Sequence, residues 1–192
     1  MLRKITYERY IGLVLGIFSI TGLIASFVLT IERFNLLKNP NLLLSCSINS
    51  TFNCASVMNS WQAELFGFPN TLMGLVGYSL IGAITLHLLI DRKLNRLIAL
   101  ASLIGASFAT IFSYWLMWES VYAIKSICLY CLLSCISMTN IFIGLLIYCI
   151  KSGELKLGSK VDAFINKGYF WILISLWYLL VFSLVFIEFQ SR

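Results

Sequence analysis

Four of the six cysteines in this 192-residue chain stand in two close pairs. Cys128 and Cys131 form a C-x-x-C, while Cys46 and Cys54 enclose a short segment of mostly polar, turn-forming residues. Two cysteines three positions apart on a helix lie on one face and within reach of a disulfide. A thiolate attacks a disulfide sulfur, so the two pairs together predict thiol–disulfide exchange.

The C-x-x-C stands at the beginning of an apolar run that predicts a helix. The free N–H groups and the macrodipole of a helix N-terminus favour a thiolate, so Cys128 is expected to ionise more readily than Cys131. Cys135 lies one turn beyond Cys131, and Cys149 lies near the far end of the same run. Buried free cysteines are usually small hydrophobic residues, which is the first reading of both.

Two other readings of the cysteines remain open. Two structural disulfides would merely hold together an exported loop, which is the usual meaning of paired cysteines in an oxidising compartment. Four cysteines could also bind zinc, although thiolate metal sites favour reducing compartments. A C-x-x-C alone separates these possibilities poorly, because it also occurs in zinc sites.

The elements that must position the cysteines are membrane helices. The chain is 60% hydrophobic and only 11% charged, whereas a soluble domain is about 25% charged. A span of the hydrocarbon core needs about 20 helical residues. Five apolar runs reach that length or fall one short, at roughly 10–31, 71–90, 97–118, 127–150 and 169–187. In lipid such runs are expected to be helices, because their backbone groups must bond within the segment.

Basic residues predict the orientation of these spans, since they accumulate on the cytoplasmic side. Ten lie on the side of the N-terminus, namely Arg3, Lys4, Arg9, Arg92, Lys93, Arg96, Lys151, Lys156, Lys160 and Lys167. Four lie on the other side, namely Arg33, Lys38, Lys125 and Arg192. The N-terminus is therefore expected in the cytoplasm. The outer side then receives a long segment, 32–70, and a short turn, 119–126, which together bring all four paired cysteines to one side.

Three segments together resemble the vitamin K epoxide reductase family of membrane thiol oxidoreductases. They are the pair Cys46 and Cys54 followed by Ala-Ser-Val-Met, the stretch Leu65-Phe-Gly-Phe-Pro-Asn70 entering the second span, and Cys128-Leu-Tyr-Cys131. The resemblance covers roughly residues 10–150. It implies an all-α membrane protein: a four-helix bundle around a quinone pocket, capped on the outer side by the long loop and a short helix.

The resemblance also divides the chain. Residues 1–150 would form the catalytic bundle with its outer redox loop at 32–70, residues 151–168 a basic cytoplasmic loop, and residues 169–192 a fifth span with a short outer C-terminus. Bacterial relatives often continue from the fifth span into a thioredoxin-like domain. Because this chain stops at Arg192, the resemblance implies that the redox partner is a separate thioredoxin-fold protein of the DsbA type.

Roles for single residues follow from the resemblance alone. Cys46 and Cys54 would be the shuttle pair, Cys54 would exchange with Cys128, and Cys131 would pass electrons to the quinone. Asn70 matches a position that hydrogen-bonds the quinone in relatives, although from the sequence it could equally cap the second span. Cys135 stands where vertebrate relatives carry a tyrosine, which makes it a weaker candidate for the quinone site.

The residues around the second loop cysteine predict a short helix. Ser56 is a weak candidate for the site, because its hydroxyl could hydrogen-bond a nearby thiolate or start this helix. The stretch from Ser56 to Phe66 carries an apolar stripe that predicts an interfacial helix lying on the bundle.

These observations predict an enzyme in a bacterial plasma membrane. It would oxidise the dithiol of its partner on the outer side and reduce a quinone of the ubiquinone, menaquinone or vitamin K type. One alternative is a vitamin K epoxide reductase that supports a carboxylase. The other is a non-catalytic membrane protein with structural disulfides. The net charge of +6 does not indicate nucleic-acid binding, because the basic residues lie in short clusters between the spans.

Overall fold

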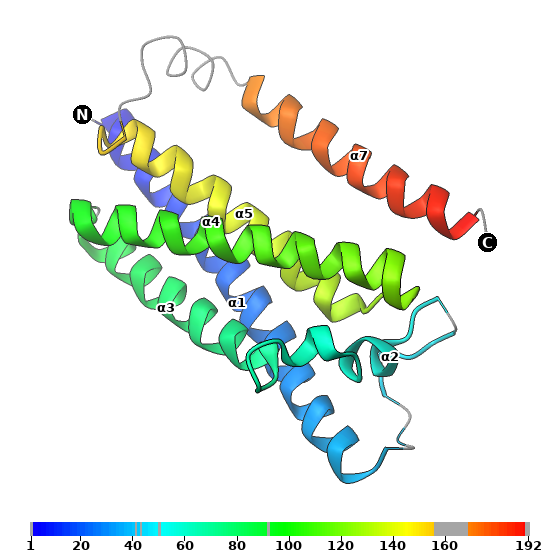
Figure 1. Cartoon of the computed structure of the whole chain (residues 1–192). Helices are drawn as coiled ribbons and strands as arrows, with labels where there is room; N and C mark the ends of the chain where they lie inside the picture. Colours follow the sequence, from blue (N-terminus) through cyan, green and yellow to red (C-terminus); the bar gives the residue numbers. More distant parts are fainter. Residues whose placement is uncertain are drawn as a thin grey trace.

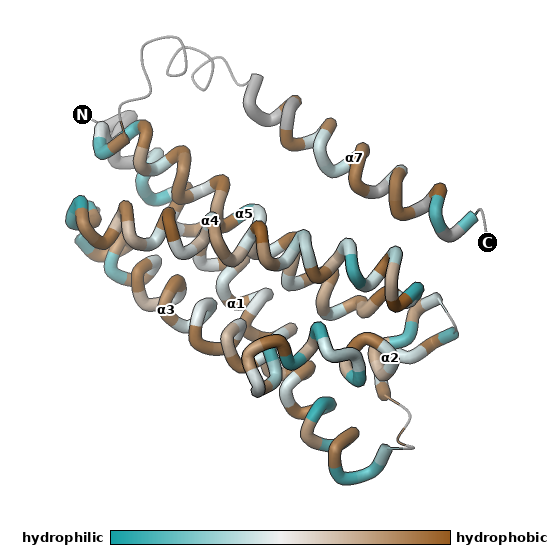
Figure 2. The backbone as a smooth tube through the Cα atoms, viewed as in Figure 1, coloured by the Kyte–Doolittle hydropathy of each residue, from teal (hydrophilic) through white to brown (hydrophobic). Residues whose placement is uncertain are grey.

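The computed structural model describes residues 2–40, 42, 44–49, 51–91, 93–155 and 169–190. Among them, four helices are long and apolar enough to cross a membrane. They pack into a bundle (Figure 1), and are α1 (Leu2–Lys38), α3 (Asn70–Asp91), α4 (Arg96–Trp118) and α5 (Leu129–Lys151). Hydrophobic residues recur along all four, and hydrophilic residues are concentrated toward the ends of the helices (Figure 2). The predicted all-α membrane protein is therefore confirmed.

Helix α1 is longer than the predicted span at 10–31. Its helical conformation continues to Lys38, two residues before Pro40, and residues that precede a proline disfavour helix. At about 1.5 Å a residue, a helix of this length exceeds a hydrocarbon core of about 30 Å by a wide margin. Its final turns therefore reach the end of the bundle that holds Cys46, Cys54 and Cys128, which we call the cysteine end. They bring Glu32 and Arg33 to that end.

Close packing between α1 and α3 requires a small residue at one point. A Cβ atom added to Gly22 on α1 would overlap the ring of Tyr78 on α3. Tyr78 is 2% exposed, and its hydroxyl contacts both the carbonyl and the hydroxyl of Ser134 on α5 at 2.8 Å. One side chain thus joins three helices of the bundle.

The segment after the disulfide loop forms a cap of two short helices, α2 (Cys54–Met58) and the 3₁₀ helix η1 (Trp61–Glu64). The expectation of one helix from Ser56 to Phe66 is wrong. Asn53 starts α2 earlier, because its side chain accepts the N–H of Ser56. Ser60 is extended between the two pieces, with φ −77° and ψ 152°.

Arg33 fastens this cap to α1. Its Nε and Nη2 donate to Glu64 Oε1 at 3.1 and 2.7 Å, and its Nη1 donates to Asn59 Oδ1 at 2.8 Å. One guanidinium therefore bonds both the end of α2 and the end of η1, because its N–H donors point in several fixed directions within one plane.

The expected turn at 119–126 is largely helical. The π-helix η2 (Glu119–Ile124) continues directly from α4, and π-helical turns are frequent at functional sites. Lys125 ends it in the left-handed region with φ 60°, and the N–H of Ser126 donates to the carbonyl of Ser120 at 3.0 Å. The chain then turns into α5.

The fifth apolar run forms a helix, α7 (Tyr169–Gln190). Trp177 Nε1 donates to the Tyr114 hydroxyl, and Asn140 Nδ2 donates to the Tyr178 hydroxyl, both at 2.8 Å. These bonds attach α7 to α4 and α5. Whether α7 crosses the membrane stays a prediction, because the spans recognised among the described residues are the four of the bundle. Residues 156–168 of the expected inner loop, and Arg192, lie outside the described residues.

Candidate functional site

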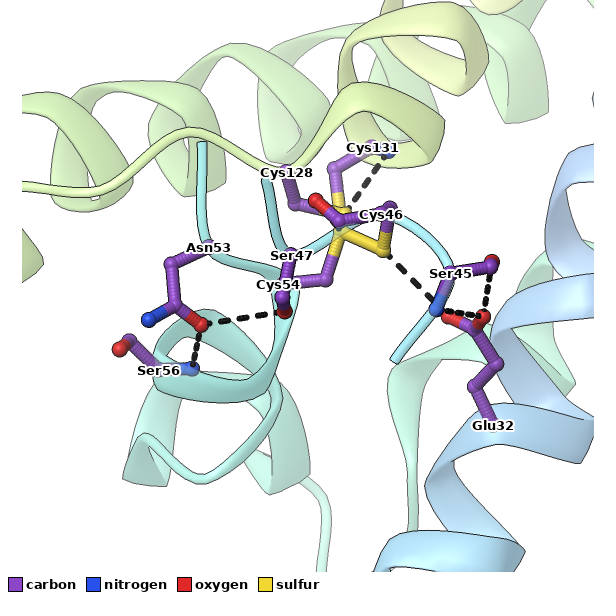
Figure 3. Close-up of a disulfide and its surroundings, with 9 residues drawn as sticks. All are labelled: Glu32, Ser45, Cys46, Ser47, Asn53, Cys54, Ser56, Cys128 and Cys131. Carbon is purple, nitrogen blue, oxygen red and sulfur yellow. Dashed lines mark hydrogen bonds between the residues drawn. A yellow bond between two sulfur atoms is a disulfide. The ribbon is translucent and has the colours of Figure 1, made fainter. Parts of the chain in front are cut away.

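Three cysteine sulfurs meet at the cysteine end. Cys46 and Cys54 form a disulfide, and the Sγ of Cys128 lies within 4.8 Å of both of its sulfurs (Figure 3). Exposure is 3% for Cys46, 0% for Cys54 and 1% for Cys128. The third sulfur is therefore close enough to exchange with the disulfide after a small movement, while a protein partner cannot reach any of the three without opening of the loop.

Main-chain pairing holds the loop against the beginning of α5. Phe52 and Ile127 form an isolated parallel β-bridge. The N–H of Ile127 donates to the carbonyl of Thr51 at 2.7 Å, and the N–H of Asn53 donates to the carbonyl of Ile127 at 3.2 Å. Cys128 follows Ile127 directly, and Cys54 follows the hydrogen-bonded Asn53, so the pairing sets the distance between the two cysteines.

Cys128 is the N-cap of α5 and precedes its first helical residue, Leu129. Its sulfur accepts the N–H of Cys131 at 3.2 Å. The two cysteines of the C-x-x-C were expected to lie on one face of a helix. Only Cys131 lies within the helix, because Cys128 is the residue that precedes it. The Cys128 sulfur thus bonds one of the N–H groups that have no partner within the helix at its N-terminus.

A cavity of about 170 Å³ lies beneath the cap and is walled by all four helices of the bundle. An apolar protein cavity of about 150 Å³ binds benzene, so this one has room for a six-membered ring. Its described lining is mainly apolar and includes Cys131 but not Cys128. The two cysteines of the C-x-x-C therefore face different regions: Cys128 faces the disulfide, and Cys131 faces the cavity.

Asn70, at the start of α3, also lines this cavity. Its Nδ2 donates to the carbonyl of Gln62 at 2.6 Å, while its Oδ1 is buried without a hydrogen-bond partner among the described residues. Because that oxygen accepts no N–H of α3, the alternative that Asn70 caps the helix is wrong. An unsatisfied buried acceptor at a cavity wall is suited to a ligand that donates a hydrogen.

Two weaker candidates lie apart from the described cavity lining. Ser56 is exposed, and its N–H is used by the cap of α2. Cys135 is buried on α5, where its carbonyl accepts the hydroxyl of Thr139 at 2.8 Å. Their assignment to the quinone site stays a prediction.

The model of the vitamin K epoxide reductase family matches residues 13–148. The chain belongs to this family. The match includes Asn70 and all four paired cysteines and stops before α7. No curated protein matches the chain in a sequence search. Membership in the vitamin K epoxide reductase family, together with the disulfide and its neighbouring thiols, indicates an oxidoreductase that works within a membrane.

The donor chemistry at the cysteine end does not fit a zinc site. Zinc is bound by cysteine thiolates, whereas two of the three clustered sulfurs are joined in a disulfide. The site instead holds one disulfide beside the free thiols of Cys128 and Cys131, which are not bonded to each other. Such an arrangement is suited to exchange.

Sequence reasoning missed two residues of the site. Gln62 holds the cavity wall together, because its carbonyl accepts from Asn70 and its Nε2 donates to Glu119 Oε2 at 3.0 Å. Glu32 contacts the disulfide loop. An acidic residue at the end of a span is usually solvated, and a glutamine in a short interfacial helix carries no signal of burial, so neither could be singled out without the fold.

Proposed function

We propose that this protein transfers two electrons from the dithiol of a separate thioredoxin-fold protein to a membrane quinone. Cys46 and Cys54 receive the electrons, and Cys128 and Cys131 pass them on. The observation that carries this proposal is the position of Cys128, whose sulfur is within 4.8 Å of the loop disulfide, while Cys131 lines a cavity large enough for a ring.

The thiol steps begin with the partner. A partner thiolate attacks Cys46 Sγ, the Cys46–Cys54 bond breaks, and Cys54 leaves as a thiolate. The second partner thiol then resolves the mixed disulfide, so the partner is oxidised and Cys46 becomes a thiol. Because both loop sulfurs are buried, this stage requires the loop to open toward the partner.

The next steps move the electrons inward. The Cys54 thiolate attacks Cys128 in a Cys128–Cys131 disulfide, and Cys131 leaves as a thiolate. Cys46 then attacks Cys54, the loop disulfide re-forms, and Cys128 is released. The resulting state has a bonded loop pair and a reduced C-x-x-C, which matches the described bonding. Cys128 and Cys131 finally re-form their disulfide and give two electrons and two protons to the quinone, which becomes a quinol.

We place the cysteine end on the outer, oxidising side of a bacterial plasma membrane, with the N-terminus in the cytoplasm. The excess of basic residues on the N-terminal side supports this orientation. We further propose that residues 1–150 form the catalytic unit and that α7 is a fifth span outside it. The end of the family match before α7 supports this division.

The test is quinol formation by the full chain in lipid nanodiscs, with a reduced DsbA-type protein as donor and ubiquinone-1 or menadione as acceptor. Each of Cys46→Ala, Cys54→Ala, Cys128→Ala and Cys131→Ala is expected to lower turnover by about a hundredfold or more, because the four thiols act in series. Cys149→Ala is the matched control, since this buried free cysteine lies outside the cluster; it should retain activity.

Two results would contradict the proposal. One is undiminished quinol formation in both Cys128→Ala and Cys131→Ala. The other is a loop disulfide that stays fully oxidised with reduced partner present, whatever the state of the quinone, which is the behaviour of a structural disulfide.

A further inference from the structure

Glu32 is a buried carboxylate beside the loop disulfide. It lies near the end of α1 and is 9% exposed. Its Oε1 accepts the N–H of Ser45 at 3.1 Å and also the Ser45 hydroxyl, while its Oε2 lies 3.4 Å from Cys46 Sγ (Figure 3). One oxygen therefore holds the loop, and the other faces the sulfur.

The charge of the neighbouring Arg33 is engaged elsewhere. All three of its guanidinium nitrogens donate to Glu64 and Asn59. A buried carboxylate is costly unless it is paired or hydrogen-bonded. Both bonds from Ser45 go to Oε1, which leaves Oε2 facing Cys46 Sγ. In the disulfide, Cys46 Sγ carries no hydrogen to donate. The contact becomes a hydrogen bond only when the disulfide opens and Cys46 is a thiol.

We propose that Glu32 accepts the proton of the Cys46 thiol when the loop disulfide re-forms. This inference rests on the proposed electron relay. In that step Cys54 is bonded to Cys128, and Cys46 must attack Cys54 Sγ. The Cys46 proton moves to Glu32 Oε2, the Cys46–Cys54 bond forms, the Cys54–Cys128 bond breaks, and the electron pair of that bond remains on Cys128 as a thiolate. Glu32 later releases the proton to water.

The surroundings explain why a built-in acceptor is needed. The attacking species in exchange is the thiolate, and Cys46 belongs to an apolar cluster of buried residues with Leu29, Leu44 and Met58. These apolar neighbours cannot accept a proton, so the fixed carboxylate within hydrogen-bond reach of the sulfur serves as the acceptor. Positioned general bases typically contribute about 10²- to 10⁴-fold to a rate.

The test is a single turnover in nanodiscs. The C-x-x-C is first oxidised with ubiquinone-1, excess quinone is removed, and reduced DsbA-type protein is added. Samples are quenched with acid and N-ethylmaleimide, and the Cys54–Cys128 linked peptide is followed by mass spectrometry. In Glu32→Gln, the lifetime of this species should increase by about a hundredfold. The amide oxygen can still accept the N–H of Ser45, so the loop remains attached.

Two controls separate the proton from the scaffold. Ser45→Ala removes the hydroxyl bonded to Glu32 Oε1 and leaves the contact of Oε2 with Cys46 in place; its intermediate should decay at the wild-type rate. Cys46→Ala removes the attacking sulfur and should make the Cys54–Cys128 species accumulate, because the forward step is blocked and only the reverse attack of Cys131 on Cys128 remains within the relay.

Three outcomes decide the matter. A long-lived intermediate in Glu32→Gln with normal decay in Ser45→Ala supports the role. The role of Glu32 is overturned if the intermediate in Glu32→Gln decays at the wild-type rate, or if its decay in Ser45→Ala is delayed as much as in Glu32→Gln. In either case, accumulation of the intermediate in Cys46→Ala would leave the relay itself intact. If Cys46→Ala traps nothing, the relay fails, and the role of Glu32 fails with it. Should Glu32→Gln not fold, Glu32→Asp replaces it, and a wild-type lifetime with Asp overturns the requirement for a carboxylate at this distance from Cys46.

Discussion

Phe52 and Ile127 pair in parallel through main-chain bonds on both sides of Phe52, and each of the two cysteines that must exchange lies just beyond this pairing. The bridge therefore acts as a positioning device. It keeps Cys128 beside the loop disulfide although the two come from segments far apart in the chain. Pre-positioning of this kind lowers the entropy cost of a reaction between two groups.

Ile127→Pro should slow the transfer of electrons from the loop to the C-x-x-C. Proline lacks the N–H that bonds the carbonyl of Thr51, so Cys128 would be held less closely. The expected change is about a tenfold slower formation of the Cys54–Cys128 species in single turnover. Ile127→Val keeps the N–H and the branched side chain and serves as the control. Equal rates in the two variants would show that the bridge has no such role.

Arg33→Ala should loosen the cap. Removal of the guanidinium breaks the bonds to Glu64 and Asn59, and Glu64 is 37% exposed, so the expected loss is only about 1 kcal/mol. Hydrogen exchange of amides 54–64 should then accelerate about fivefold. Arg33→Lys keeps the positive charge but lacks the several N–H donors of the guanidinium, so it should give an intermediate rate of hydrogen exchange. Unchanged exchange in Arg33→Ala would refute this account of the cap.

Asn70→Ala should impair the quinone stage and leave the thiol stage unchanged. It removes the unsatisfied oxygen at the cavity wall and the donor to the Gln62 carbonyl. Because a quinone has no hydrogen to donate, Asn70 Oδ1 can accept only from the hydroxyl that forms as the quinol is made, so its loss should lower the turnover number at saturating quinone by about tenfold. Ser113→Ala is the control, because it lines the same cavity with a hydroxyl already bonded to Ala109. If Asn70→Ala lowered the rate of Cys54–Cys128 exchange as much as the rate of quinol formation, the separation of the two stages would be contradicted.

Gly22→Ala should destabilise the bundle. The new methyl group would overlap the Tyr78 ring, and overpacking of a core typically costs about 1–3 kcal/mol. Gly77→Ala on α3 is the matched control, since a Cβ there meets no atom of the described residues within 4 Å. Unfolding by dodecyl sulfate in mixed micelles measures both. Similar stability of the two variants would mean that α1 and α3 do not pack closely at Gly22.

The apolar runs were sufficient to predict the four long membrane helices, and the positions of the cysteines between these runs predicted that Cys46, Cys54 and Cys128 lie at one end of them. The catalytic roles of the four paired cysteines stay predictions.

Neither the apolar runs nor the cysteine positions predicted how the outer segment folds, because its helices are set by single side chains. Asn53 starts α2 before Ser56, and Ser60 interrupts the expected helix. The turn after α4 became a π-helix closed by Lys125 in a left-handed conformation, which no periodicity signals. The contact of Glu32 with the disulfide loop could not be predicted either, because it forms only where the loop folds back onto α1.

The distance between Cys54 and Cys128 is the central claim, and one cross-linking measurement tests it most directly. The double variant Cys46→Ala/Cys131→Ala leaves Cys54 and Cys128 without their usual partners. After mild oxidation in nanodiscs, peptide mapping should find a Cys54–Cys128 disulfide in nearly every molecule, since their sulfurs already lie within 4.8 Å. Two free thiols, or a bond from Cys54 to Cys135 or Cys149, would contradict the account.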